Sequence, residues 1–179
     1  MLYLKDTHHD NLLFLDSEFD CGKLVQLAIF HFVKVENCIY KLNSDFNIYI
    51  KHNKIGKYCY EITGITPSFL NTYGVEPKQS RELIQLFFNE LKGSIMIIGH
   101  GIKQDIKVIK EFGIELPDYQ SYCTYNAAKR IYGADSKLSL ASLANQAGLY
   151  TECHDAHYDA LALIPVFSMI KEKEGETNG

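Results

Sequence analysis

The stretch Phe14-Leu-Asp-Ser-Glu-Phe19 places two carboxylates, Asp16 and Glu18, at the end of an apolar run that begins at Leu12. On a β-strand, residues two apart face the same side, so both carboxylates are expected to point at one site from the end of the first strand. Neither has an Arg or Lys beside it in the sequence, and a carboxylate in an apolar setting is costly unless a partner neutralises it. A strand that runs into a solvated turn would show the same pair, so its interpretation depends on acids elsewhere in the chain.

The bulk composition is that of a globular protein with a full core. The 179 residues, 46% hydrophobic and 22% charged, predict one domain over residues 1–170, followed by a flexible polar tail over 171–179. No run of about eighteen apolar residues exists to span a bilayer, and the N-terminus lacks the order of a signal peptide, so we expect a cytoplasmic protein without a membrane partner. The five cysteines, an odd number without a Cys-x-x-Cys pair, are expected to be free thiols.

The charge distribution limits how the protein can hold a polyanion. The formal net charge is −4, so the global attraction that dominates non-specific binding to nucleic acid is absent. The most basic cluster is Lys51-His-Asn-Lys-Ile-Gly-Lys57, which is predicted to be a turn or loop. Any grip on nucleic acid must therefore be local, and we expect help from a homodimer or from a polymerase or helicase assembly.

Hydrophobic periodicity predicts an α/β fold. Residues 11–60 have the pattern of three antiparallel strands, and Ser94–Ile98 and Tyr119–Cys123 add two more, which gives a mixed five-stranded sheet flanked by helices. The predicted helices begin at Pro67, after the N-cap Thr66, and at Pro77, and cover residues 102–112, 125–132, 138–146 and 156–170, with Gly113, Gly133 and Gly148 as stops.

Two further acids stand where predicted helices begin. Asp105 follows His100 by about one turn, and alone it is equally typical of a surface acid near a helix N-terminus. His154 and Asp159 are five residues apart, so on one helix they would diverge by about 140°. They can converge if His154 lies in the loop before the helix and Asp159 in its first turns. Residues 150–155 have the polar composition of such a loop.

Four carboxylates and one histidine suit a hydrolytic site with two divalent cations. Hard oxygen ligands select Mg²⁺ or Mn²⁺, and two such ions about 3.5–4 Å apart can clamp the attacking and leaving oxygens of a phosphodiester. A histidine that is neutral near pH 7 is then suited to deprotonate water.

These motifs resemble those of the DnaQ-like 3′ to 5′ exonucleases of the DEDDh type. This family includes RNase T and polymerase proofreading subunits such as the ε subunit of DNA polymerase III. Phe14-Leu-Asp16-Ser-Glu18 resembles the first motif, Asp105 the second and His154-x-x-x-x-Asp159 the third, in the family's order. The tyrosine variant of the family would need Tyr at position 155, which is Asp.

The resemblance implies a ribonuclease H-like fold in which Asp16, Glu18, Asp105 and Asp159 hold two Mg²⁺ or Mn²⁺ ions. It implies that His154 activates water and that 5′-mononucleotides leave from the 3′ end of single-stranded nucleic acid. It also implies that residues at the first and second motifs contact the terminal nucleotide, and the candidates are Ser17, Phe19 and His100. A core position for Phe19 and a capping or core role for His100 remain open alternatives.

Several features depart from the family pattern and bear on the substrate. His100-Gly101 stands where His-Asn is usual, and Gln104 stands where Phe is common before the second acid. The connection after Glu18 is short, and the two arginines of the chain offer few bidentate phosphate contacts. Single-stranded DNA is the favoured substrate, with RNA or short oligonucleotides as the alternative. A catalytically silent binding module is a less favoured alternative, because such a module would be expected to have lost some of the five residues. An HD-type phosphohydrolase is disfavoured, because that fold is all-helical and the first third of this chain is rich in predicted strands.

Overall fold

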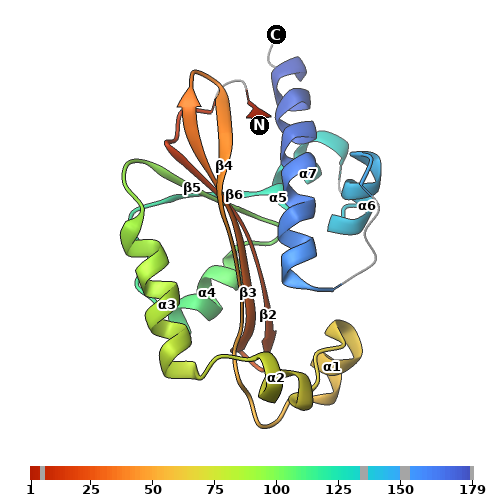
Figure 1. The fold of residues 1–179 in the computed structure, drawn as a ribbon. Coiled ribbons are helices and arrows are strands. Elements are labelled where there is room, and N and C mark those ends of the chain that lie inside the picture. The colour runs from red at the N-terminus through yellow and green to blue at the C-terminus, as the bar shows by residue number, and fades with distance from the viewer. Residues whose placement is uncertain (5–6, 134–136, 150–153, 178–179) are drawn as a thin grey trace.

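The computed structural model describes residues 1–4, 7–133, 137–149 and 154–177. It contains a mixed sheet in the order β1-β4-β3-β2-β5-β6, with helices on both sides (Figure 1). The strands are β1 (Leu2–Tyr3), β2 (Asn11–Asp20), β3 (Lys23–Glu36), β4 (Ile39–Tyr49), β5 (Ile95–Gly99) and β6 (Gln120–Cys123). Strands β2, β3 and β4 are antiparallel, whereas β5 and β6 run parallel to β2. The α/β prediction is confirmed.

The predicted count of five strands is wrong, because a sixth strand lies at the edge. Strand β1 pairs with β4 through Leu2 and Tyr3. Two residues are too few to show an alternating pattern, so this strand left no periodic signal in the sequence.

The helices fall mostly where the sequence predicts them. They are α1 (Lys57–Thr63), α2 (Pro67–Tyr73), α3 (Pro77–Glu90), α4 (Lys103–Glu111), α5 (Thr124–Tyr132), α6 (Leu140–Gln146) and α7 (Ala156–Thr177). Thr66 caps α2, since its hydroxyl accepts a hydrogen bond from the Phe69 amide at 3.0 Å. Helix α1 was missed, because its N-cap is Gly56, which has no capping side chain. Helix α7 continues to Thr177, where the polar tail was expected from residue 171.

Alternation along β2 divides the core between the two faces of the sheet. Leu13 and Leu15 pack in one cluster with residues of α3 and α4. Leu12 and Phe14 pack in another cluster with residues of α7, which lies across the opposite face (Figure 1). Asp16 continues the series that faces α7, so the end of β2 presents its acids to the beginning of that helix.

The hairpin between β2 and β3 closes immediately beyond these acids. Its two turn residues, Cys21 and Gly22, have φ angles of 48° and 80°, the combination of a type I′ turn, whose twist matches that of the flanking strands. This tight turn accounts for the short connection after Glu18.

Two remaining sequence predictions concern membranes and cysteines. Among the described residues, no helix is both long and apolar enough to cross a membrane. Cys21, Cys38, Cys59 and Cys123 are free thiols, whereas Cys153, in the predicted loop, lies outside the described residues.

Candidate active site

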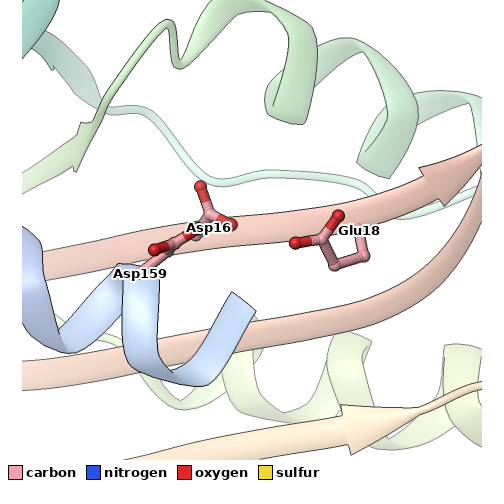
Figure 2. Close-up of side chains that lie close together, drawn as sticks. All are labelled: Asp16, Glu18 and Asp159. Atoms are coloured by element: carbon pink, nitrogen blue, oxygen red, sulfur yellow. The ribbon is translucent and has the colours of Figure 1, made fainter. Parts of the chain in front are cut away.

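Three of the predicted carboxylates converge at the end of β2. One carboxylate oxygen from each of Asp16, Glu18 and Asp159 lies within 4.8 Å of the others. Figure 2 shows Asp16 and Glu18 projecting from the same strand, and Asp159 reaching them from the first turns of α7. The strand spacing of Asp-x-Glu therefore brings its two acids to one place, and the helix supplies the third.

The fourth carboxylate, Asp105, comes from the first turn of α4 and is held by Ser17. The Ser17 hydroxyl donates to Asp105 Oδ1 at 2.7 Å, and the Ser17 backbone amide donates to the same oxygen at 3.1 Å. Asp105 is buried and lies outside the group of three, yet its charge raises the pKa of Asp16. Asp105 thus borders the cluster, with one oxygen committed to Ser17.

Burial and mutual repulsion make these acids reluctant to ionise. Burial raises the pKa of Glu18 to about 7, with further contributions from the charges of Asp159, Asp155 and Asp105. The pKa of Asp159 is raised to about 7 by burial and then by the charge of Asp155. Burial, followed by the charge of Asp105, holds the pKa of Asp16 well above its usual range. A concentration of acids whose ionised forms lack a cationic partner favours the binding of a cation.

The donor set fits a hard divalent cation. Three carboxylate oxygens within 4.8 Å are the kind of ligands that Mg²⁺ and Mn²⁺ select, whereas zinc sites usually include nitrogen or sulfur donors. Burial also raises the pKa of Asp105, to about 6, while its hydrogen bonds from Ser17 lower it. Those hydrogen bonds favour the ionised form of Asp105 next to the cluster.

His154 lies in the segment immediately before α7, as the sequence predicts, and its side chain is exposed. It is not among the described residues that converge on Asp16. The next residue, Asp155, caps the helix, because its Oδ1 accepts hydrogen bonds from the backbone amides of His157 at 2.9 Å and Tyr158 at 3.3 Å. His154 is therefore exposed just before the cap of α7, whereas Asp159, inside the helix, joins the cluster.

The three candidate substrate contacts occupy different environments. Ser17 is buried against Asp105, and Phe19 is partly buried against the core cluster of α3 and α4. His100 Nδ1 lies 3.0 Å from the Thr124 hydroxyl, and burial lowers its pKa. The hydroxyl of Ser17 and one ring nitrogen of His100 are thus engaged within the protein.

The basic loop is less available than its composition suggests. Lys51 pairs with Glu76 at 2.7 Å, and Lys57 pairs with Glu61 at 3.5 Å. Lys54 is exposed.

Sequence reasoning missed a polar group that holds the start of α7: Gln26, Tyr49 and Asp155. Tyr49 donates to Asp155 Oδ2 at 2.9 Å, and Gln26 Nε2 donates to Asp155 Oδ1 at 3.3 Å. An Asp directly before an apolar helix is an N-cap signal, and a lone Gln in an apolar strand is an unusual buried amide. Both signals were present, whereas the contact of Tyr49 depends on the register of β4.

Comparison with known proteins gives consistent results. A family model described as Exonuclease matches residues 14–167, and no curated protein matches the chain. A structure of E. coli exonuclease I in complex with a dT13 oligonucleotide is similar, with a TM-score of 0.77 and 17% identity over 94% of this chain and 42% of that one. The zinc-bound form of E. coli exonuclease I in complex with single-stranded DNA has a TM-score of 0.76, with 18% identity over 94% of this chain and 42% of that one.

A 3′-exonuclease that recognises the 3′ end of a histone mRNA stem-loop is also similar. Its TM-score is 0.69, with 14% identity over 93% of this chain and 65% of that one. The chain therefore spans less than two thirds of the length of each of these proteins.

Proposed function

The chain belongs to the RNase T exonuclease family, and we propose that it removes 5′-mononucleotides from the 3′ end of single-stranded nucleic acid by hydrolysing phosphodiester bonds. The observation that carries this proposal is the convergence of Asp16, Glu18 and Asp159 within 4.8 Å, with Asp105 at their border. The fold, which is ribonuclease H-like, supports it.

We assign the binding of two Mg²⁺ or Mn²⁺ ions to Asp16, Glu18, Asp105 and Asp159. When bound, such ions neutralise the negative charge of the scissile phosphate and activate water. The protein contributes oxygen donors whose pKa values are raised by burial and by the charges of neighbouring acids. The zinc-bound form of E. coli exonuclease I supports a metal-binding role for this fold.

We assign the general base to His154. It precedes the capped end of α7 on the exposed side, where a water molecule and the substrate can reach it. Its imidazole would accept the proton of the attacking water while the carboxylates remain ionised. The water oxygen bonds to phosphorus while the bond between phosphorus and the 3′ oxygen of the penultimate nucleotide breaks. The released mononucleotide keeps the 5′-phosphate, and the 3′ oxygen of the shortened strand takes up a proton from solvent.

We favour single-stranded DNA as the substrate, because E. coli exonuclease I was captured with a dT13 oligonucleotide. RNA is the second candidate, since the similar 3′-exonuclease recognises an mRNA stem-loop. Phe19 follows Glu18 in β2 and is only partly buried, so it is our candidate for contact with the terminal base. A homodimer, a polymerase or helicase assembly, and a cytoplasmic location all stay predictions.

The test is digestion of a 5′-labelled single-stranded DNA oligonucleotide beside its RNA counterpart, with Mg²⁺ or Mn²⁺ and with EDTA. We expect a ladder that shortens from the 3′ end and disappears with EDTA and in Asp159→Asn. The matched control is Asp118→Asn, at an exposed position, which should cleave as the parent does. The faster counterpart identifies the substrate class. Cleavage that persists in Asp159→Asn, or no cleavage of either oligonucleotide, would contradict the proposal.

A further inference from the structure

The first turn of α7 is fastened to the sheet by a group of polar contacts that we call the clasp, formed by Gln26, Tyr49 and Asp155. Gln26 is fully buried in β3, where an amide without hydrogen bonds would be costly. Its Nε2 lies 3.3 Å from Asp155 Oδ1 and 3.1 Å from Asn47 Oδ1, and its Oε1 accepts a hydrogen bond from the Ala156 amide at 3.2 Å. Both ends of the buried amide are therefore used to hold the beginning of the helix.

The clasp stands directly beside the acids of β2. In the antiparallel register, Glu18 of β2 pairs with Gln26 of β3, and Gln26 pairs with Tyr49 of β4. The Tyr49 hydroxyl donates a hydrogen bond to Asp155 Oδ2 at 2.9 Å. Three neighbouring strands thus present Glu18, Gln26 and Tyr49 in one row. Gln26 and Tyr49 both donate hydrogen bonds to Asp155, the residue that caps α7.

The rest of the contact allows α7 to lie close to the sheet. Ala28 is paired with Asp16 and is buried in the same cluster as Ala156 and Ala160 of α7. Small side chains at all three positions permit a close approach, but they do not specify how the helix is rotated or where along its axis it begins. Directional hydrogen bonds of the clasp can specify both.

A second contact is made by Asp45, four residues before Tyr49 in β4. His157 Nε2 lies 2.9 Å from both carboxylate oxygens of Asp45, and its ring packs on Phe30 with the centroids 5.0 Å apart. Asp45 and Phe30 pair across the strands, so a separate cross-strand pair also holds the first turn of α7.

We propose that Gln26 and Tyr49 are positioning residues that act through Asp155. They fix the first turn of α7 so that Asp159 meets Asp16 and Glu18. The same contacts hold His154 in place immediately before the helix. This inference rests on the proposed function for its catalytic consequence. Neither residue needs to touch the substrate, because a small displacement of a reacting group is enough to slow an enzyme substantially.

The test compares Tyr49→Phe with Tyr73→Phe. Both tyrosine rings contact Phe69, with centroid distances of 4.8 Å and 4.9 Å, so each variant removes a hydroxyl from a ring that packs on the same aromatic side chain. Tyr73 is exposed, and its loss of a hydroxyl should change nothing. Tyr49→Phe should lower kcat about tenfold, the lower end of what loss of an outer-sphere partner costs a metal site, and weaken Mn²⁺ binding to the substrate-free protein by a similar factor. KM and the melting temperature should stay near those of the parent.

A double-mutant cycle with Asp155→Asn separates positioning from general loosening. Asn at position 155 keeps an oxygen that can cap the helix, but it loses the carboxylate that accepts from Tyr49. If Tyr49 acts through Asp155, the double variant should have about the kcat of the slower single variant, because coupled residues are not additive. Gln26→Met, which removes the buried amide at similar length, is the second variant, and it should lower Mn²⁺ affinity as well if it folds.

The outcomes distinguish the two proposals. A parent that neither cleaves nor binds Mn²⁺ refutes the proposed function, and the clasp with it. A parent that does both, while Tyr49→Phe matches Tyr73→Phe in kcat and Mn²⁺ affinity, refutes the clasp alone. Independent effects of Tyr49→Phe and Asp155→Asn that multiply in the double variant would also overturn it.

Discussion

Removal of one acid from the metal-free cluster should stabilise the protein, and Glu18→Gln is the substitution that tests this. The folded-state pKa of Glu18 is raised from an ordinary value of 4.5 to about 7. The folded protein therefore retains a proton that the unfolded chain releases between these values, so its stability falls as the pH rises through that window and the full penalty applies above pH 7. Gln avoids the penalty, because it carries no charge.

The pKa rise sets the size of the effect. At about 1.4 kcal/mol for each tenfold change in a protonation equilibrium, the rise corresponds to about 3 kcal/mol. Because Glu18 is partly exposed, screening by water lowers our expectation to about 2 kcal/mol. For a chain of this length, that difference should raise the melting temperature at pH 8 by about 4–8 °C.

The assay is thermal unfolding of the parent and Glu18→Gln in EDTA at pH 8 and pH 5. The gain at pH 8 should largely vanish at pH 5, where the folded parent keeps its proton. Saturating Mg²⁺ should reverse the order, because it stabilises only a site that binds it well. Glu82→Gln, at an exposed position of α3, is the matched control and should show neither effect. An equal gain at both pH values, or none at pH 8, would refute the electrostatic reasoning.

Three further predictions follow from individual contacts. His154→Ala should lower kcat about 10²–10⁴-fold, because it removes the general base. The affinity for Mn²⁺, measured by calorimetry, should not change. Weakened Mn²⁺ binding would instead identify His154 as a metal ligand. Ser17→Ala removes a hydrogen bond that lowers the pKa of Asp105, so the rising limb of the pH profile of kcat should move to higher pH, and an unmoved limb would count against the assignment. Gly56→Ala would bring a Cβ to 2.7 Å from Asp20 Oδ1, beside the hydrogen bond that the Gly56 amide donates to Asp20 Oδ2 at 2.8 Å. It should therefore lower the melting temperature, and an unchanged melting temperature would contradict this reasoning.

The sequence was most informative where a local pattern carries the structure. An apolar run located β2, loose alternation located β3, and a segment rich in Ile, Tyr and Phe located β4. Thr66 and Pro67 marked the start of α2, because a cap and a fixed φ angle act within a few residues. Helix α7 runs past Ile170 into a charged segment where Glu174 meets Arg130 of α5 at 3.2 Å. Contacts between residues so far apart leave no local pattern, so the helix end could not be predicted.

The candidate site shows the same division. The spacing in β2 predicted that Asp16 and Glu18 share a face, and both acids do lie in one group with Asp159. His154 precedes α7 as expected, whereas its convergence with Asp159 stays a prediction. The clasp was not predicted, because the partnership of Tyr49 with Asp155 depends on strand register and helix placement together. The pairing of Lys51 with Glu76 was not predicted for a similar reason, since the two residues are far apart in the sequence, whereas Lys57 pairs with Glu61 in its own helix.

The alternation of β2 also gives a reason for the residue between its two acids. Asp16 and Glu18 face α7, so Ser17 must face the side of α4, from which Asp105 approaches. A small side chain with a hydroxyl at this position can donate to Asp105 Oδ1 at 2.7 Å, whereas an apolar residue would leave a buried carboxylate with one donor fewer. One short strand thus holds two acids directly and a third through its middle residue, while the clasp delivers the fourth from α7. The site depends on both faces of the sheet, which is why neither helix alone would define it.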